Sequence, residues 1–436
     1  MRAKPFIVVS TFVLVLTACT ASSTRDPNRR AGAQEGSSPA ADVLLLDTDS
    51  GPVAVSAATG SVLISRAGAI ASPEGARLYS TSTQDGDTVL VTSDPATGDQ
   101  VSSTTIRGAL DVRVASNSGG AVALMEPLPS GVDPWTPVPR SRTEIVVADP
   151  TGGRDPRRYH LRGNYEPEAF SVEDSRLFLI QYLPAEAPAV YRVTVLDLAD
   201  GDVYEVHGRF KTAPQRMPGI RLRQVFDGTT SQLYTLYSTK PHPYAQDYGS
   251  WGHGDEPETF VHVLNLERGW AYCAGLPRRF WGEPANAQAI APSPDGALLY
   301  IVDSMRGAVA VMNTRTLAIE RAGRVELSAL GGVATSAQVS ADGRTLYVGS
   351  LEDGAAVFAI DTATLEVAHR WPMSGDVSGL GLSVDGRRLY VALQDGVAIL
   401  DSATGAELTS VPFQGIESIL HVATVDSADA LAAPAG

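Results

Sequence analysis

The sequence predicts an all-β protein, a β-propeller of four-stranded antiparallel blades around a central channel. The first observation is a repeated phrase: SPDGALLYIVD at 293–303 is followed by SADGRTLYVGS at 340–350 and SVDGRRLYVAL at 383–393. The second is the spacing of the copies, about 45 residues, which is typical of one propeller blade. The third is that strand-like segments at the two ends of the chain complete one blade between them.

Each copy of the repeat is interpreted as four short strands. The turn S-x-D-G begins a hairpin, because Asp bonds the local backbone and Gly adopts a positive φ. Small residues precede the turn, as in GLGLS at 379–383, and suit an innermost strand that is crowded by its neighbours. Two strands rich in β-forming residues follow. A turn such as DTATL at 361–365 then leads into a fourth, more polar strand.

Eight innermost strands can be traced along the chain. Their markers lie near residues 72, 116, 171, 226, 293, 340, 383 and 424. The last marker lacks three partner strands, which DVLLLD, GPVAVSAATG and SVLISR supply within 42–66. Pairing the N- and C-terminal strands in one blade closes the ring and removes two open sheet edges. We therefore predict eight blades, with seven as the alternative if a divergent segment between 109 and 280 is misread.

The best-preserved units resemble YVTN-type β-propeller repeats. The resemblance is good over 285–412, fair over 67–105 and weak between them. The Asn that ends the eponymous Tyr-Val-Thr-Asn motif is replaced by Asp303, Ser350 and Leu393. The resemblance implies the fold and assigns no activity, because propellers include binding modules, scaffolds and enzymes.

The first 18 residues are typical of an export signal. Arg2 and Lys4 precede an apolar run that is too short to span a bilayer comfortably. The stretch LTAC at 16–19 resembles the bacterial lipobox, in which the cysteine sulfur, here Cys19, receives a diacylglycerol. The resemblance implies a lipoprotein held at the cell membrane, on its extracytoplasmic side, since two acyl chains anchor a protein stably.

The rest of the chain divides by composition. Residues 1–18 form the signal peptide, and 19–41 comprise the lipidated Cys19 and a flexible tether rich in Ser, Ala, Gly and Pro. The propeller is expected over 42–426, and a disordered C-terminal tail over 427–436.

Charge and cysteine content narrow the function. The formal net charge of −15 disfavours nucleic acid as a partner, because nucleic-acid binding needs clustered cations. The chain has two cysteines, so acylation of Cys19 leaves Cys273 without a disulfide partner. The apolar run GWAYCAGL around Cys273 predicts a buried, inert thiol.

Three consecutive blades differ from the rest in one loop, the connection between the second and third strands. These loops all open on one face of a propeller. They are enlarged at 125–143, 182–191 and 238–259, whereas the corresponding loop at 393–396 is minimal. We expect the three enlarged loops to build a continuous wall beside the mouth of the channel.

The third enlarged loop is the best candidate for a binding site. Its aromatic rings offer contact area at low entropic cost, and ionisable groups lie among them. The predicted binding residues are Tyr244, Tyr248, Trp251, His242, His253 and Asp247, with Trp135 from the first loop. The alternative is a loop that only caps its own blade. The His spacing matches no zinc signature, so neither a metal nor another cofactor is predicted.

No catalytic motif accompanies these loops. The sequence has no G-x-S-x-G elbow, no HExxH and no Gly-rich phosphate loop. We therefore predict a binding or scaffold module that recognises a protein or a cell-envelope polymer. The alternative is a propeller enzyme, lactonase- or hydrolase-like, with its site at the channel mouth. A third possibility is a structural subunit of an envelope complex.

Overall fold

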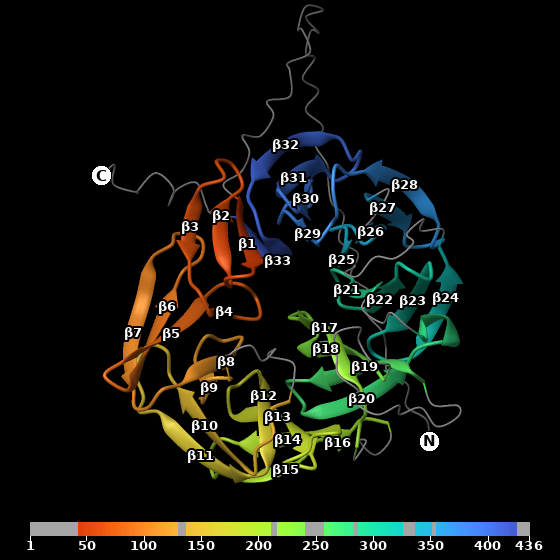
Figure 1. Cartoon of the computed structure of the whole chain (residues 1–436). Coiled ribbons are helices and arrows are strands. Elements are labelled where there is room, and N and C mark those ends of the chain that lie inside the picture. Colours follow the sequence, from red (N-terminus) through yellow and green to blue (C-terminus); the bar gives the residue numbers. More distant parts are fainter. Residues whose placement is uncertain are drawn as a thin grey trace, which may run out of the picture. The chain divides into compact units, whose positions relative to one another are not determined.

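A computed structural model describes residues 42–129, 137–210, 216–239, 257–282, 287–325, 336–350 and 355–424. The chain divides into two compact units, Met1–Ser38 and Pro39–Gly436, of which the first lies outside the described residues. The second unit is a ring of eight β-sheets (Figure 1). The predicted fold class and the count of eight blades are confirmed, and the alternative of seven is wrong.

We name the blades A to H in chain order and give their strands from the channel outwards. Blade A contains β33 (Ile416–Thr424), β1 (Asp42–Thr48), β2 (Val53–Ser56) and β3 (Val62–Ser65). Blade B contains β4 (Ile70–Ala71), β5 (Leu78–Gln84), β6 (Asp87–Ser93) and β7 (Gln100–Ile106). Blade C contains β8 (Asp111–Ala115), β9 (Val122–Met125), β10 (Arg142–Ala148) and β11 (Arg157–Arg162). Blade D contains β12 (Asn164–Phe170), β13 (Arg176–Leu183), β14 (Val190–Asp197) and β15 (Val203–Glu205).

Blade E has a fifth strand at its outer edge. It contains β17 (Ile220–Asp227), β18 (Gln232–Ser238), β19 (Thr259–Asn265) and β20 (Trp270–Gly275), with β16 (His207–Gly208) parallel to β20. A short 3-10 helix, η1 (Arg278–Phe280), follows. Blade F contains β21 (Gln288–Pro292), β22 (Leu298–Asp303), β23 (Ala308–Asn313) and β24 (Ile319–Arg324). Blade G contains β25 (Ser336–Val339), β26 (Thr345–Gly349), β27 (Ala356–Asp361) and β28 (Val367–Pro372). Blade H contains β29 (Gly379–Leu382), β30 (Arg388–Leu393), β31 (Gly396–Asp401) and β32 (Glu407–Pro412).

The repeated S-x-D-G turn joins the first and second strands of a blade. In blade F the Ser293 hydroxyl lies 2.6 Å from Asp295 Oδ1 and accepts a bond of 2.9 Å from the Leu298 amide. The same contacts recur at Ser340 and Ser383. The glycines of these turns have φ of 66°, 73° and 70°, a region that favours glycine. The repeat is therefore a hydrogen-bonded hairpin turn.

Ring closure depends on a buried carboxylate at the start of the described chain. β33 pairs antiparallel with β1, so that Asp42 lies opposite Thr424. Asp42 is 1% exposed and accepts bonds from Thr424 Oγ1 (2.7 Å), from Arg388 Nη1 (3.1 Å) and from the Tyr390 hydroxyl. One side chain thus joins the first and last described strands to blade H, and the predicted closure is confirmed.

The hydrophobic core lies between neighbouring blades. Between blades F and G it consists of aliphatic and aromatic side chains, among them Val309, Val348 and Phe358. Inner strands pack so closely that small residues are required there. A Cβ on Gly379 of β29 would lie 2.6 Å from the Ile419 amide nitrogen of β33. The described strands begin at Asp42 and end at Thr424, and none of the described residues belongs to a helix long and apolar enough to cross a membrane.

Candidate functional site

The enlarged loops of blades C and D contact each other on the face where the second and third strands are joined. In the described parts of these loops, the Arg140 amide donates to the Ala185 carbonyl at 3.1 Å. Asn164, the first residue of β12, donates to the carbonyls of Val138 (2.8 Å) and Ala185 (3.0 Å). These contacts fix the two loops to the inner strand of blade D. The first two loops of the expected wall therefore contact each other, whereas residues 240–256 of the third loop lie outside the described residues.

The residues predicted to bind a partner lie outside the described part of the chain. This holds for Trp135 of the first loop, and for Tyr244, Tyr248, Trp251, His242, His253 and Asp247 of the third. It also holds for Cys19 and for the proposed C-terminal tail. Their roles stay predictions.

Under these loops, the inner strands of blades C, D and E carry charged side chains that we call the channel-mouth cluster. Its members are Arg113 of β8, Glu166 and Glu168 of β12, Arg221 and Gln224 of β17, and Arg140 from the loop before β10. The three strands are neighbours around the channel (Figure 1). Glu166 lies two residues after Asn164, which contacts the loops, so the cluster lies at the base of the enlarged loops.

A β-bulge interrupts the pairing of the first and second strands in each of these three blades. The extra residue is Arg113 in β8, Glu168 in β12 and Leu222 in β17. The same pairing is regular in blades F, G and H, whereas blade A also has register shifts between β33 and β1. A bulge turns a side chain away from the alternation of its strand, and bulges are frequent beside functional sites. In two of the three bulges, the extra residue belongs to the channel-mouth cluster: Arg113 and Glu168.

Glu166 is held between two guanidinium groups without close contact to either. Its Oε1 lies 3.5 Å from Arg113 Nε, and its Oε2 lies 3.5 Å from Arg140 Nη2. Both distances exceed that of an ordinary hydrogen bond. Arg113 Nε is buried and has no hydrogen-bond partner. Burial raises the pKa of Glu166, against the opposing effect of Arg113, Arg140 and Arg221.

Glu168, in contrast, is closely paired. Its Oε2 lies 3.0 Å from Arg221 Nη1, and its Oε1 accepts a bond of 2.7 Å from Gln224 Nε2. The Gln224 amide also donates to Thr235 Oγ1 at 3.0 Å. The Glu168 side chain is 3% exposed. Burial lowers the pKa of the Arg221 guanidinium, but Glu168 and its neighbours more than offset this, so the Arg221 pKa is raised.

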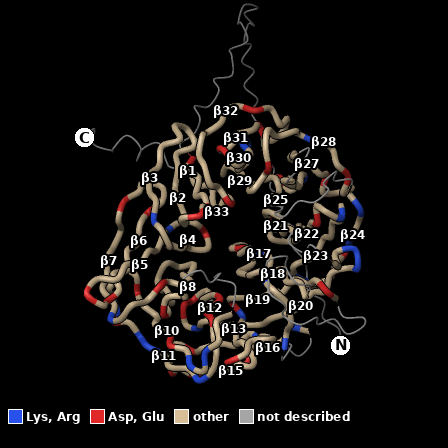
Figure 2. The backbone as a smooth tube through the Cα atoms, in the orientation of Figure 1, with Lys and Arg blue, Asp and Glu red and all other residues tan. Residues whose placement is uncertain are grey.

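The cluster has more cationic than anionic groups. Three arginines face two glutamates, and a fourth arginine, Arg223, follows on β17. Elsewhere acidic and basic residues are interspersed around the ring (Figure 2). Tyr182 of β13 borders the cluster, and burial raises its pKa, so its hydroxyl stays protonated. This arrangement is suited to binding an acidic group, since arginine donates in a fixed geometry to carboxylate or phosphate.

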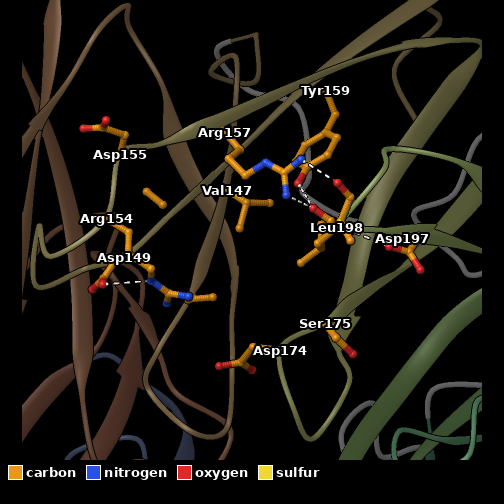
Figure 3. Close-up of a pocket in the computed structure, with 13 residues that line it drawn as sticks. Val147, Asp149, Arg154, Asp155, Arg157, Tyr159, Asp174, Ser175, Asp197 and Leu198 are labelled. Atoms are coloured by element: carbon orange, nitrogen blue, oxygen red, sulfur yellow. Dashed lines mark hydrogen bonds and ion pairs between the residues drawn. The ribbon is translucent and has the colours of Figure 1, made fainter.

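A second hollow lies on the opposite face, between blades C and D. It has a volume of about 380 Å³, and Figure 3 shows Arg154, Arg157 and Asp174 around it. Arg154 pairs with Asp149 at 3.2 Å, and Arg157 donates to the carbonyls of Leu198 and Ala199. The Asp174 carboxylate accepts from Ser118 of blade C. The bonds of Arg157 and Asp174 join the two blades, whereas the Arg154–Asp149 pair lies within blade C, so the hollow has a structural role.

Metal ligands of the usual types are not grouped in the described ranges. There, no set of three His, Cys, Asp or Glu side chains is placed to hold an ion. The channel-mouth cluster itself was missed by the sequence interpretation. Its signal was the presence of charged residues in inner strands, as in DVRVA at 111–115 and NYEPEAF at 164–170, where the regular blades carry small residues.

No protein family and no curated protein matches the chain. Solved structures with a similar fold include dihydro-heme d1 dehydrogenase NirN in complex with DHE, with 16% identity and a TM-score of 0.52 over 88% of this chain and 75% of that one. They also include apo AztD from Citrobacter koseri, with 11% identity and a TM-score of 0.52 over 88% of this chain and 97% of that one. At these identities the similarity shows the propeller fold alone.

Proposed function

We propose that the protein is a binding or scaffold module, a YVTN-type propeller lipoprotein that recognises its partner through the enlarged-loop face of blades C, D and E. The observation that carries the proposal is the coincidence of three departures in the same three blades. These are the enlarged loops, the inner-strand bulges and the channel-mouth cluster. Blade A also has register shifts between β33 and β1, but its loop between the second and third strands is short and it supplies no residue of the cluster. A feature that every blade needs would occur in blades F, G and H as well.

The channel-mouth cluster favours a partner with an exposed acidic group. Arg113 Nε is a buried donor without a hydrogen bond. The Glu166 carboxylate lies between Arg113 and Arg140, but its oxygens are 3.5 Å from the nearest nitrogen of each. A carboxylate or phosphate of the partner would form shorter, charge-assisted bonds to these groups. The aromatic residues predicted in the third loop would supply apolar contact around that anchor. A protein or an acidic cell-envelope polymer meets both requirements, whereas nucleic acid is not proposed because the net charge is −15.

The location belongs to the same proposal. The lipobox-like LTAC at 16–19 supports anchoring through Cys19 on the extracytoplasmic side of the cell membrane. The segment 20–41 then acts as a tether of the propeller. Replacement of Cys19 by Ala is expected to release the protein from the membrane fraction, and retention of the variant there would contradict the anchor.

The test of the binding face is a crosslinking pulldown from native membranes. It compares the intact chain with a variant in which 240–257 is shortened to a tight turn, and with Arg113→Gln. Loss of one charge-assisted bond, worth about 1.5–3 kcal/mol, should weaken capture by Arg113→Gln roughly tenfold or more. Arg344→Gln is the matched control, since Arg344 is exposed in the turn of blade G on the opposite face. Equal capture by all four proteins would contradict the proposal.

The alternative function, an enzyme with its site at the channel mouth, is favoured by one observation. Burial raises the pKa of Glu166, and a buried carboxyl with a raised pKa can act as a general acid or base. An assay for lactone or ester hydrolysis with wild type and Glu166→Gln decides between the two functions. Hydrolysis that the variant loses would establish the enzyme.

A further inference from the structure

The interface between blades D and E contains sulfur and imidazole groups in a layer that is otherwise apolar. Packed there are Tyr191 of β14, Met217 of the segment before β17, Tyr237 of β18 and Cys273 of β20. His262 of β19 adjoins them, with its ring edge-to-face to Tyr237 at 6.3 Å. Of the described apolar side chains packed between blades F and G, none contains sulfur. The contact between two sulfur atoms is therefore not required for the packing of two blades.

Three of these side chains converge from three segments of the chain. His262 and Cys273 are direct partners in the antiparallel pair β19–β20, which places both side chains on one face of the sheet, about 5 Å apart at Cβ. Cys273 Sγ lies 3.4 Å from Met217 Sδ. Met217 is held in place by two backbone bonds with Tyr191, of 2.7 and 2.9 Å.

The three side chains differ in burial. His262 and Met217 are each 4% exposed. Cys273 is half-buried and not fully buried as the sequence predicted, so it is the most accessible of the three.

Two aromatic side chains enclose the sulfur atoms at this place. Tyr191 is 4% exposed and stacks on Tyr237 with ring centroids 5.0 Å apart. Both rings belong to the same packed layer as Met217 and Cys273. A hydrophobic shell of this kind controls the access of solvent to a metal site.

We propose that Cys273, Met217 and His262 form a binding site for one Cu(I) ion. Thiolate and thioether are soft donors that select Cu(I), and imidazole is compatible with it, whereas hard cations prefer oxygen. Two sulfurs 3.4 Å apart can share one ion at metal–sulfur distances of about 2.3 Å. On binding, a copper–sulfur bond forms at Cys273, and the thiol proton leaves to solvent. No electron is transferred, because the ion arrives as Cu(I).

The test is retention of Cu(I) against a chromogenic chelator under anaerobic conditions. Every protein in the test carries Cys19→Ser, so that Cys273 is the one remaining thiol of a chain with two cysteines. The parent protein should retain one Cu(I) per chain when supplied with the acetonitrile complex of the ion. Cys273→Ala should lose it, and Met217→Leu and His262→Gln should weaken retention by more than about tenfold, as loss of even an outer partner does. Met312→Leu, a buried methionine of blade F, is the matched control and should retain the ion.

Thermal unfolding of each variant shows whether the variant is folded, so that loss of the ion can be distinguished from loss of the fold. The proposal is overturned if the parent protein fails to retain Cu(I), or if a folded Cys273→Ala variant retains it equally. If Cys273→Ala does not fold, Met217→Leu against Met312→Leu gives the answer, because both are volume-conserving substitutions. The test involves neither the enlarged loops nor the channel-mouth cluster, so its result is independent of the proposed binding face.

Discussion

Blades F, G and H and blades C, D and E are built from the same four-stranded unit but differ in its inner half. In F, G and H the first and second strands pair without interruption, and the Ser–Asp turn bonds are alike in all three. In C, D and E each inner pair has a bulge, and charged residues occupy the inner strands. In the function that we propose, the regular blades supply the ring, whereas the departures from regularity supply recognition.

The largest stability effect should come from the regular part, at ring closure. Asp42→Ala removes the partner of Arg388, whose side chain is 11% exposed, and of the Tyr390 hydroxyl. Breaking such a buried pair typically costs about 3–5 kcal/mol. The measurement is the free energy of unfolding in urea. Asp395→Ala, at an exposed position in the tight loop of blade H, is the control and should cost little. Equal losses for the two variants would show that the carboxylate does not secure the ring.

A smaller effect is expected in the channel-mouth cluster. Glu168→Ala removes the acceptor of Arg221 and Gln224, and hydrogen bonds to charged groups contribute about 1.5–3 kcal/mol. Glu173→Ala, exposed in the next turn of the same blade, should be neutral. The same urea series compares both variants with Asp42→Ala. A loss at Glu168 as large as that at Asp42 would place the cluster among the groups that hold the ring together.

The need for glycine in the repeated S-x-D-G turn can be tested by comparing Gly343, which lies in the turn, with Gly375, which does not. Gly343 has a φ of 73° and open space where a Cβ would be, so Gly343→Ala reports the cost of the left-handed conformation, about 1–2 kcal/mol. Gly375 has the same open space without a positive φ, so Gly375→Ala should cost almost nothing. Chemical denaturation of the pair measures the difference. Identical stabilities would mean that the turn does not need glycine.

The smallest effect is a pH dependence of opposite sign in the two regions. The hydrogen bond from Ser340 holds the pKa of Asp342 below its usual value, so its stabilising effect is present above pH 3.8 and is lost as the pH falls. Burial raises the pKa of Glu166 above its usual 4.5, so its ionisation opposes folding as the pH rises. From pH 3 to 7, wild type should gain stability relative to Asp342→Asn and lose it relative to Glu166→Gln. A common trend for the two variants would falsify this assignment.

Much of the fold could be predicted from the sequence, because its signals are local. The S-x-D-G turns at 293–296, 340–343 and 383–386 identify their blades, and the terminal strands complete one another. The channel-mouth cluster could not be predicted in this way. Arg113 and Glu168 are 55 residues apart, and each is the extra residue of a bulge. Alternation along a strand gives the direction of a side chain only while the register is regular, so a bulge removes that signal.

The proposed Cu(I) site could not be predicted from local sequence either. Met217 lies outside the blade strands, in a segment joined to blade D through the isolated pair with Tyr191. The sequence places Cys273 on an apolar strand, but nothing local indicates that Met217 returns to contact it. The burial predicted from GWAYCAGL reflected the composition around Cys273, whereas the side chain is half-buried in the structure.

Site-specific photocrosslinking in native membranes tests whether the enlarged-loop face binds the partner. One protein carries the crosslinker in place of Ala187, exposed in the enlarged loop of blade D, and another in place of Val384, which is 70% exposed in the turn of blade H on the opposite face. We predict a covalent adduct with the partner from position 187 and none from position 384. An adduct from position 384 without one from position 187 would show that the partner does not bind through the enlarged-loop face.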